Sequence, residues 1–376
     1  MQALLNYILW YPTPEIIPGF RVRWYGLLFA MGFIFGQIIL DKIFKAENKP
    51  QRDVETFVII AVIFTVIGAR LGHVFFYEAE KYLANPIDII KIWEGGLASH
   101  GAAVALIIGV WVYINYYIKI SFSGIKIKKI TREGQTYFWV IDRLVITVAL
   151  AGALIRTGNF MNSEIIGKPT NSDYGVVFAH DPQRYFEQNN ANIEDIEFEK
   201  GEGRQALAAH HAEPVDMIIT FKKRRFSKEQ AEEYAKFQLA YGLQKVGYVR
   251  KHILIPSDQK LNYSVTQDRG VTTLRAQVWG VARYPAQLYE ALSCLLLFFV
   301  LFGIWSKYKE KTPKGLLFGI FLVVVFSLRF VYEFFKENQV AFEDKLEYNM
   351  GQYLSIPLVT VGIIVIIVTL LKSRKK

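Results

Sequence analysis

The residue types best suited to chemistry gather in one short stretch, Arg156–Gly167. This stretch follows Leu144–Ile155, which contains no charged residue. Its polar side chains include those of Arg156, Asn159, Asn162 and Glu164. Charged and amide groups at a membrane boundary are costly unless they bind a partner. A guanidinium among them predicts a polar site for a phosphate or a carboxylate, because its planar fork binds such oxygens through two parallel hydrogen bonds.

The apolar residues that must position this stretch form seven blocks. The chain has 376 residues, of which 52% are hydrophobic, and the hydrophobic ones come in long runs rather than amphipathic stripes. A helix needs about 20 residues to cross the hydrocarbon core of a bilayer. We therefore expect seven transmembrane helices, at about 24–40, 54–76, 97–118, 138–156, 285–306, 315–335 and 349–371.

The charges of the short loops predict an orientation. Basic residues concentrate in four segments that share one side if the chain has seven spans, namely 41–53, 119–136, 307–314 and the tail Lys372–Lys376. The positive-inside rule then places the N-terminus outside and the C-terminus inside. The formal net charge of +10 is better explained by such cytoplasmic loops facing anionic lipid than by nucleic acid.

The fold class expected is an all-α polytopic membrane protein with an α+β extracytoplasmic head inserted between helices four and five. Helices one to four fill residues 1–160, the head 161–283, and helices five to seven with the basic tail 284–376.

Within the expected head, 214–221 and Gly247–Ile255 are predicted as strands. Ser227–Gln230 has the pattern of a capping box that opens a helix to about Leu239. Residues 181–205 are expected to be irregular.

With this topology, several spans bring polar side chains to one level near their outer ends. These side chains are Arg70, His73, His100, Arg156, Arg283, Tyr284, Gln287, Tyr289, Glu290, Arg329 and Glu333. Ionisable residues inside a membrane normally line a cavity or pair with one another, so one polar cavity near the outer leaflet is predicted. Arg329 and Glu333, four residues apart, are alternatively an ion pair on one helix face. His100 is the stronger histidine candidate, because glycines at 95, 96 and 101 allow close approach of the backbone.

The spacing Arg156-x-Gly158-Asn159-Phe160-x-Asn162-x-Glu164-x-x-Gly167 closely resembles the signature of the prolipoprotein diacylglyceryl transferase family. Further matching blocks follow the family's order: Trp24–Gly26, Gly68–Gly72, Gly95–Gly101, Tyr284–Glu290, Arg329–Phe335 and Gly351–Pro357. The resemblance covers roughly residues 20–180 and 275–371.

The resemblance implies a multi-pass enzyme of the bacterial cytoplasmic (inner) membrane. Such an enzyme transfers the diacylglyceryl group of phosphatidylglycerol to the thiol of the lipobox cysteine in a prolipoprotein. A thioether forms and glycerol phosphate leaves, which is the first step of lipoprotein maturation. The implied partners are phosphatidylglycerol, prolipoprotein signal peptides and membrane lipid, without nucleic acid, metal or organic cofactor.

The resemblance also implies roles for individual residues. Arg156 and Arg329 are expected to stabilise the leaving phosphate. The thiol has an ordinary pKa of about 8.5 and is mostly protonated, so a base is needed; His100 is the candidate base, or else it orients the headgroup while phosphate or water takes the proton. The residues expected to bind substrate are Tyr25, Arg70, Asn159, Asn162, Glu164, Gly167, Tyr289 and Glu333. The chain departs from the family pattern at Ile155, Ala102 and Val325.

Two other function classes use the same polar cavity. A transporter of anionic solutes would be expected to show repeat symmetry and polar groups near the midplane, and the sequence shows neither. A non-catalytic lipid-binding or scaffold protein would predict that His100 and the arginines are dispensable for chemistry.

Overall fold

The computed structural model describes residues 7–17, 22–92, 95–121, 124–172, 174–202, 204–207, 211–337 and 346–374. Lys375 and Lys376 of the basic tail lie outside this part of the chain. The chain divides into two compact units. The first comprises Met1–Leu27, Arg156–Glu290 and Val331–Met350, and the second Leu28–Ile155, Ala291–Phe330 and Gly351–Lys376.

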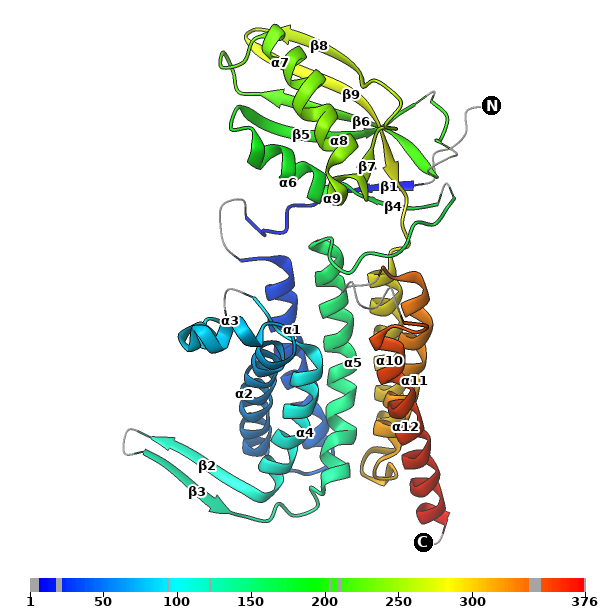
Figure 1. Ribbon diagram of the computed structural model, residues 1–376. Coiled ribbons are helices and arrows are strands. Elements are labelled where there is room, and N and C mark those ends of the chain that lie inside the picture. The colour runs from blue at the N-terminus through cyan, green and yellow to red at the C-terminus, as the bar shows by residue number, and fades with distance from the viewer. Residues whose placement is uncertain are drawn as a thin grey trace. The chain divides into compact units, whose positions relative to one another are not determined.

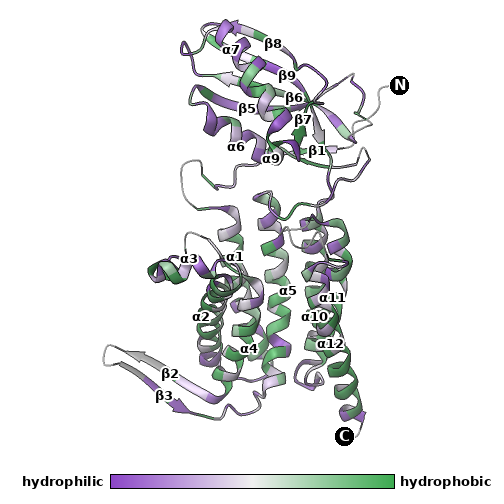
Figure 2. Ribbon diagram, in the orientation of Figure 1, coloured by the Kyte–Doolittle hydropathy of each residue, from purple (hydrophilic) through white to green (hydrophobic). Residues whose placement is uncertain are grey.

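Long apolar helices dominate the chain (Figures 1 and 2). Among the described residues, six are long and apolar enough to cross a membrane: α1 (Trp24–Ala46), α2 (Gln51–Phe76), α5 (Tyr137–Met161), α10 (Ala286–Tyr308, continued by the 3-10 turn Lys309–Lys311), α11 (Leu316–Tyr332, continued by the 3-10 turn Glu333–Phe335) and α12 (Met350–Arg374). The expected third span is the shorter apolar helix α4, Ser99–Asn115. The chain is therefore a mainly helical, polytopic membrane protein.

Small residues bring two helices of the second unit into close contact. A Cβ atom added at Gly68 of α2 would overlap Ala105 of α4, and one added at Gly101 would overlap the carbonyl oxygen of Gly68. Backbones can approach this closely only where side chains are absent, which is how small residues pack transmembrane helices. The motif glycines of α2 and α4 thus fix the position of the helix that begins beside His100.

Two buried carboxylates of the second unit have several hydrogen-bond partners each. The Glu47 carboxylate accepts hydrogen bonds from Arg143 at 2.9 Å, from Trp139 at 2.7 Å and from Trp305 at 2.6 Å. Nearby, the Asp142 carboxylate accepts the backbone N–H groups of Gly315 and Phe318, at 2.7 and 2.8 Å, at the start of α11. Such partners offset the cost of taking these charges out of water.

Shorter elements connect the helices of the second unit. They are α3 (Ala79–Ala84), the 3-10 turn Pro86–Ile90, and the antiparallel pair β2 (Tyr116–Ser121) and β3 (Gly124–Lys129).

The first unit contains an antiparallel sheet covered by helices. The strand order is β5 (Ile193–Lys200), β6 (Ala212–Phe221), β9 (Val271–Val281) and β7 (Ile253–Leu254), with β8 (Asn262–Asp268) also paired to β9. A separate parallel pair joins β1 (Tyr7–Trp10) to β4 (Gly175–Phe178). The helices are α6 (His180–Asn189), α7 (Lys228–Tyr234), α8 (Ala240–Lys245) and α9 (Gly247–Arg250), and α7 and α8 lie across one face of the sheet (Figure 1).

Alternating side chains of β6 and β9 form the core of this sheet. Val215, Met217 and Ile219 are fully buried, as are Leu274, Ala276 and Val278 of β9. The period of two directs one set of side chains toward the covering helices.

Two local sequence predictions in this region are confirmed and two are wrong. The strand predicted at 214–221 lies within β6, and the capping box at Ser227 is present, with Gln230 N–H donating to Ser227 Oγ at 3.3 Å. The supposedly irregular residues 181–205 instead contain α6 and β5. The prediction of a strand at Gly247–Ile255 is wrong, because Gly247–Arg250 forms the helix α9 and only Ile253–Leu254 pairs with β9.

Candidate functional site

The stretch singled out by its chemistry ends α5 and turns sharply. Ser163 and Ile165 adopt φ angles of 55° and 56°. This left-handed region is disfavoured for a β-branched side chain such as isoleucine. Two hydrogen bonds hold the turn, from the Glu164 N–H to the Asn159 carbonyl at 2.9 Å and from Gln287 Nε2 to the Glu164 carbonyl at 2.6 Å. The surroundings therefore impose this conformation against the local preference of the chain.

Two asparagines hold the Glu164 carboxylate. Asn159 Nδ2 donates to one oxygen at 3.1 Å, and Asn162 Nδ2 donates to the other at 3.0 Å. Asn159 Oδ1 in turn accepts from Arg156 Nη1 at 3.4 Å. The carboxylate and guanidinium are thus linked through one buried amide, so the orientation of each constrains the other.

A charge network extends from Arg156 to residues distant in sequence; its members are Arg156, Glu290, Glu333, Lys336 and Asn349. Arg156 Nε forms an ion pair with Glu290, and Lys336 forms one with the same carboxylate. Lys336 also pairs with Glu333 at 3.1 Å, and Asn349 Nδ2 donates to the second Glu333 oxygen at 3.0 Å.

Two cations and two carboxylates balance in this network. The Lys336 side chain is 2% exposed and that of Arg156 is 24% exposed. An incoming phosphate can therefore reach Arg156 and compete with Glu290 for its guanidinium, while Lys336 remains to neutralise the displaced carboxylate.

Gly167 lets three segments of the first unit meet. A Cβ atom at this position would overlap the Tyr284 carbonyl oxygen and lie 2.9 Å from that of Phe335. Arg283 Nη1 donates to the Gly167 carbonyl at 2.9 Å and pairs with Glu337 at 2.6 Å. Burial raises the pKa of the Glu337 carboxyl, but the charges and hydrogen bonds of Arg283 and Lys251 together outweigh it, so the pKa is lowered. Gly167 thus serves close packing beneath the turn.

Two tyrosines flank the same region. Tyr25 lies against Gly158, where an added Cβ atom would be 2.9 Å from the Tyr25 Cα atom. Tyr289 lies with its ring centroid 6.4 Å from that of Tyr332 and is 38% exposed.

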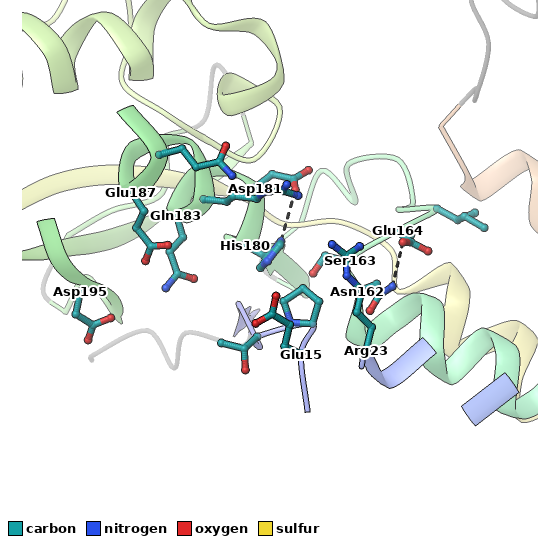
Figure 3. Close-up of a pocket in the computed structure, with 15 residues that line it drawn as sticks. Glu15, Arg23, Asn162, Ser163, Glu164, His180, Asp181, Gln183, Glu187 and Asp195 are labelled. Atoms are coloured by element: carbon teal, nitrogen blue, oxygen red, sulfur yellow. Dashed lines mark hydrogen bonds and ion pairs between the residues drawn. The ribbon is translucent and has the colours of Figure 1, made fainter. Parts of the chain in front are cut away.

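A cavity of about 700 Å³ opens on the other side of the turn. Figure 3 shows its side chains, which come from the N-terminal segment, the turn, α6 and β5. The lining residues are Thr13, Pro14, Glu15, Arg23, Asn162, Ser163, Glu164, Ile165, His180, Asp181, Gln183, Arg184, Glu187, Gln188 and Asp195. The lining is predominantly polar and acidic, unlike a pocket for an acyl chain.

His100 begins α4 in the second unit. Its ring lies 5.0 Å from that of Phe76 and 5.8 Å from that of Tyr77. Its Nε2 atom is buried and has no hydrogen-bond partner in the described part of the chain. A nitrogen in this state is available to accept a proton or a hydrogen bond from a ligand.

Arg70 is buried, and its guanidinium donates hydrogen bonds to backbone carbonyl oxygens. Its guanidinium donates to those of Asp88 at 2.6 Å, Ile89 at 2.8 Å and Gly95 at 2.5 Å, with longer bonds to Lys91 and Gly96. It therefore fixes the segment that leads into α4 and His100.

The expected site residues divide between the two units. The first unit holds Tyr25, Arg156, Asn159, Asn162, Glu164, Gly167, Tyr289 and Glu333, whereas Arg70, His100 and Arg329 belong to the second. Sequence reasoning overlooked Lys336 and Asn349. The signal for Lys336 was its position three residues after Glu333 at a span end, a spacing that brings helical side chains together.

Comparisons with known proteins place these residues in a family context. Residues 14–368 match the family model described as prolipoprotein diacylglyceryl transferase. Relatives named phosphatidylglycerol–prolipoprotein diacylglyceryl transferase occur in Tolumonas auensis, 30% identical over 98% of this chain and 99% of the relative, and in Chloroherpeton thalassium, 30% identical over 96% and 94%. A third, from Porphyromonas gingivalis, is 30% identical over 97% of this chain and 96% of its own length.

Proposed function

The chain belongs to the prolipoprotein diacylglyceryl transferase family, and we propose on this premise that it transfers the diacylglyceryl group of phosphatidylglycerol to a prolipoprotein cysteine. The cysteine sulfur forms a bond to the terminal glyceryl carbon as the bond from that carbon to the phosphate oxygen breaks. The thiol proton leaves with a base, and glycerol phosphate departs. The acceptor is the lipobox cysteine.

The observation that carries this proposal is the position of Arg156 at the exposed end of a balanced charge network. Its guanidinium contacts Glu290 and Asn159. A phosphate that takes the place of Glu290 would gain a bidentate partner. Hydrogen bonds that strengthen as charge grows on the leaving phosphate accelerate the reaction.

We assign roles to the other residues on the same basis. Arg329 is the second phosphate ligand, and His100 accepts the thiol proton through its buried nitrogen. Asn159, Asn162 and Glu164 orient Arg156 and bind the headgroup glycerol, beside Tyr25 and Tyr289. Glu333 holds Lys336, and Gly167 supports the turn.

Arg70 acts by positioning His100, because carbonyl oxygens take up its guanidinium. This differs from the direct substrate contact expected for Arg70 from the sequence.

The membrane arrangement is part of the proposal. Seven helices, with α4 as the third, cross the bacterial inner membrane with the N-terminus outside and the C-terminus inside. Residues 161–283 then form an extracytoplasmic head between transmembrane segments 1–160 and 284–376. The basic loops described above support this orientation.

The decisive assay uses the full-length protein in detergent with phosphatidylglycerol and a peptide that contains a lipobox cysteine. Release of glycerol phosphate, together with a peptide mass increased by one diacylglyceryl group, is the expected result. A matched peptide with serine in place of the cysteine serves as the control. Absence of both products, under conditions where an established transferase is active, would refute the proposal.

A further inference from the structure

Apart from Asn162 and Glu164, the residues that line the acidic cavity beside the signature turn have no role in the reaction described so far. Five carboxylates line it, those of Glu15, Glu164, Asp181, Glu187 and Asp195. Two guanidinium groups, from Arg23 and Arg184, oppose them. The cavity is therefore electronegative, which disfavours a phosphate and favours a neutral or cationic ligand.

Several of these carboxylates have partners that limit their availability. Glu164 is held by two asparagines, and Asp181 lies 3.6 Å from His180 and 3.7 Å from His252. Glu187 and Asp195 line the same cavity; Glu187 is hydrogen-bonded by Gln183, and one Asp195 oxygen accepts the Ile196 N–H at 2.9 Å, but no ion pair neutralises either carboxylate in the described part of the chain. Burial raises the pKa of Glu187 and the Asp195 charge adds to this, while the hydrogen bond from Gln183 and the nearby His180 act in the opposite direction. A ligand cation between these two carboxylates would relieve their repulsion.

Ser163 supplies an independent sign of a ligand. The residue is only 8% exposed, and its Oγ atom is buried without a hydrogen-bond partner in the described ranges. It lines the cavity beside Asn162 (Figure 3). A buried hydroxyl normally has a partner, so a polar ligand that enters the cavity would satisfy it.

The turn has two sides that belong to one short segment. Asn162 and Glu164 line the cavity. Asn162 donates a hydrogen bond to Glu164, and Glu164 is connected to Arg156 through hydrogen bonds of Asn159. A molecule in the cavity is thus adjacent to the groups that orient Arg156. Of the two proposed substrates, only the polypeptide can offer a cationic side chain to an electronegative cavity, whereas the headgroup of phosphatidylglycerol is anionic.

We propose that this cavity binds the polar residues that follow the acceptor cysteine of the prolipoprotein, with a preference for a basic side chain among them. The inference rests on the proposed function, since it names a subsite for that substrate. Ser163 Oγ hydrogen-bonds the peptide backbone, and Glu187 with Asp195 receives the cationic side chain.

The test compares two peptides that differ only in carrying lysine or glutamate shortly after the cysteine. The wild-type enzyme is expected to use the lysine peptide with the higher kcat/KM. The double variant Glu187→Gln/Asp195→Asn should lower kcat/KM for the lysine peptide about fivefold, through KM, as expected for the loss of two partly exposed charges. The KM for phosphatidylglycerol should not change.

A matched variant controls for the change in net charge. Glu194→Gln/Glu197→Gln removes two carboxylates from exposed positions of β5 that do not line the cavity. It should retain the wild-type preference for lysine. An equal loss in both variants, or no loss in the first, would overturn the inference.

A binding measurement separates the subsite from the proposed function. A fluorescent peptide with serine in place of cysteine, followed by lysine, should bind the wild type more tightly than the Glu187→Gln/Asp195→Asn variant. Transfer activity without this difference would contradict the subsite alone. Binding with this difference but without transfer by any peptide would contradict the proposed reaction alone. A change in the KM for phosphatidylglycerol would identify the cavity as a lipid subsite and overturn the inference.

Discussion

At the scale of single residues, the guanidinium of Arg156 contacts two partners that lie in different directions. Nε contacts Glu290 and Nη1 contacts Asn159. A lysine carries one ammonium group and cannot reproduce this planar geometry. Arg156→Lys is therefore expected to lower kcat/KM for transfer by at least about tenfold, which corresponds to one lost charge-assisted hydrogen bond.

The thermal unfolding midpoint of Arg156→Lys provides the control for folding. It should stay close to that of the wild type, because the side chain is partly exposed and the charge is kept. Full transfer activity in this variant would remove Arg156 from the role of phosphate ligand.

Lys336 is expected to contribute to the stability of the fold rather than to catalysis. Its ammonium group is buried between Glu290 and Glu333. Lys336→Met leaves these carboxylates with one fewer cation. Breaking a buried ion pair in this way costs about 3–5 kcal/mol. The expected result is a much lower thermal unfolding midpoint.

A second substitution tests this explanation. Adding Glu333→Gln to Lys336→Met removes one uncompensated charge and should restore part of the lost stability. If the double variant were as unstable as the sum of both single changes predicts, the two charges would not be coupled.

His252 predicts how stability depends on pH. Burial, with the charge of Arg283, lowers its pKa to about 4, while Asp181 and Glu337 act in the opposite direction and Lys251 adds to the lowering. Between about 6.5 and 4 the unfolded histidine binds a proton that the folded one does not. Stability should therefore fall as the pH is lowered through this window, by up to about 3 kcal/mol.

The variant His252→Gln isolates this contribution. Thermal midpoints measured between pH 7 and pH 4 should fall less in the variant than in the wild type. Parallel curves would assign the loss to groups other than His252.

At the scale of elements, the packing of α2 against α4 depends on glycine. Gly101→Ala places a methyl group against the carbonyl oxygen of Gly68, and overpacking of this kind costs about 1–3 kcal/mol. The thermal unfolding midpoint should fall. Gly303→Ala in α10 is the matched control, because an added Cβ atom there meets no atom within 4 Å. It should be neutral or stabilising by up to about 1 kcal/mol. Equal effects would show that helix propensity, not close packing, decides the outcome.

The elements also show what the sequence can predict. The long apolar runs are a strong compositional signal, and the six helices of the described residues that are long enough to span a membrane lie where such runs were found. Local chemistry likewise predicted the Ser227 cap. The strand prediction at 247–255 failed because Gly247–Arg250 forms α9 and only Ile253–Leu254 pairs with β9, a strand that follows later in the chain. α6 was missed because its amphipathic pattern spans only ten residues.

At the scale of the whole molecule, the orientation can be measured directly. In a Cys294→Ala background, Asp258→Cys should react with a membrane-impermeant maleimide in intact spheroplasts. Lys311→Cys should react only after the membrane is permeabilised, because the basic loop 307–314 is expected inside. Both positions are exposed in the structure. The reverse labelling pattern would show that the orientation in the membrane is opposite to the one proposed.

Much of the candidate site could be predicted from the sequence because its signature is local. Arg156, Asn159, Asn162 and Glu164 lie within nine residues, and hydrogen bonds connect them. The pairing of Arg156 with Glu290, and of Glu290 with Lys336, could not be predicted, because it depends on how distant segments fold together. The hydrogen bonds from Arg70 to backbone carbonyl oxygens could not be predicted either, because a sequence does not show which backbone groups lack partners.

The first unit is built from three separate pieces of the chain, and this has a consequence for biosynthesis. A ribosome releases Arg156 and then Glu290 long before Lys336 and Asn349. A nascent chain that ends before residue 331 contains Glu290 but lacks Glu333, Lys336 and Asn349. The charge network therefore assembles only when nearly the whole protein has been synthesised.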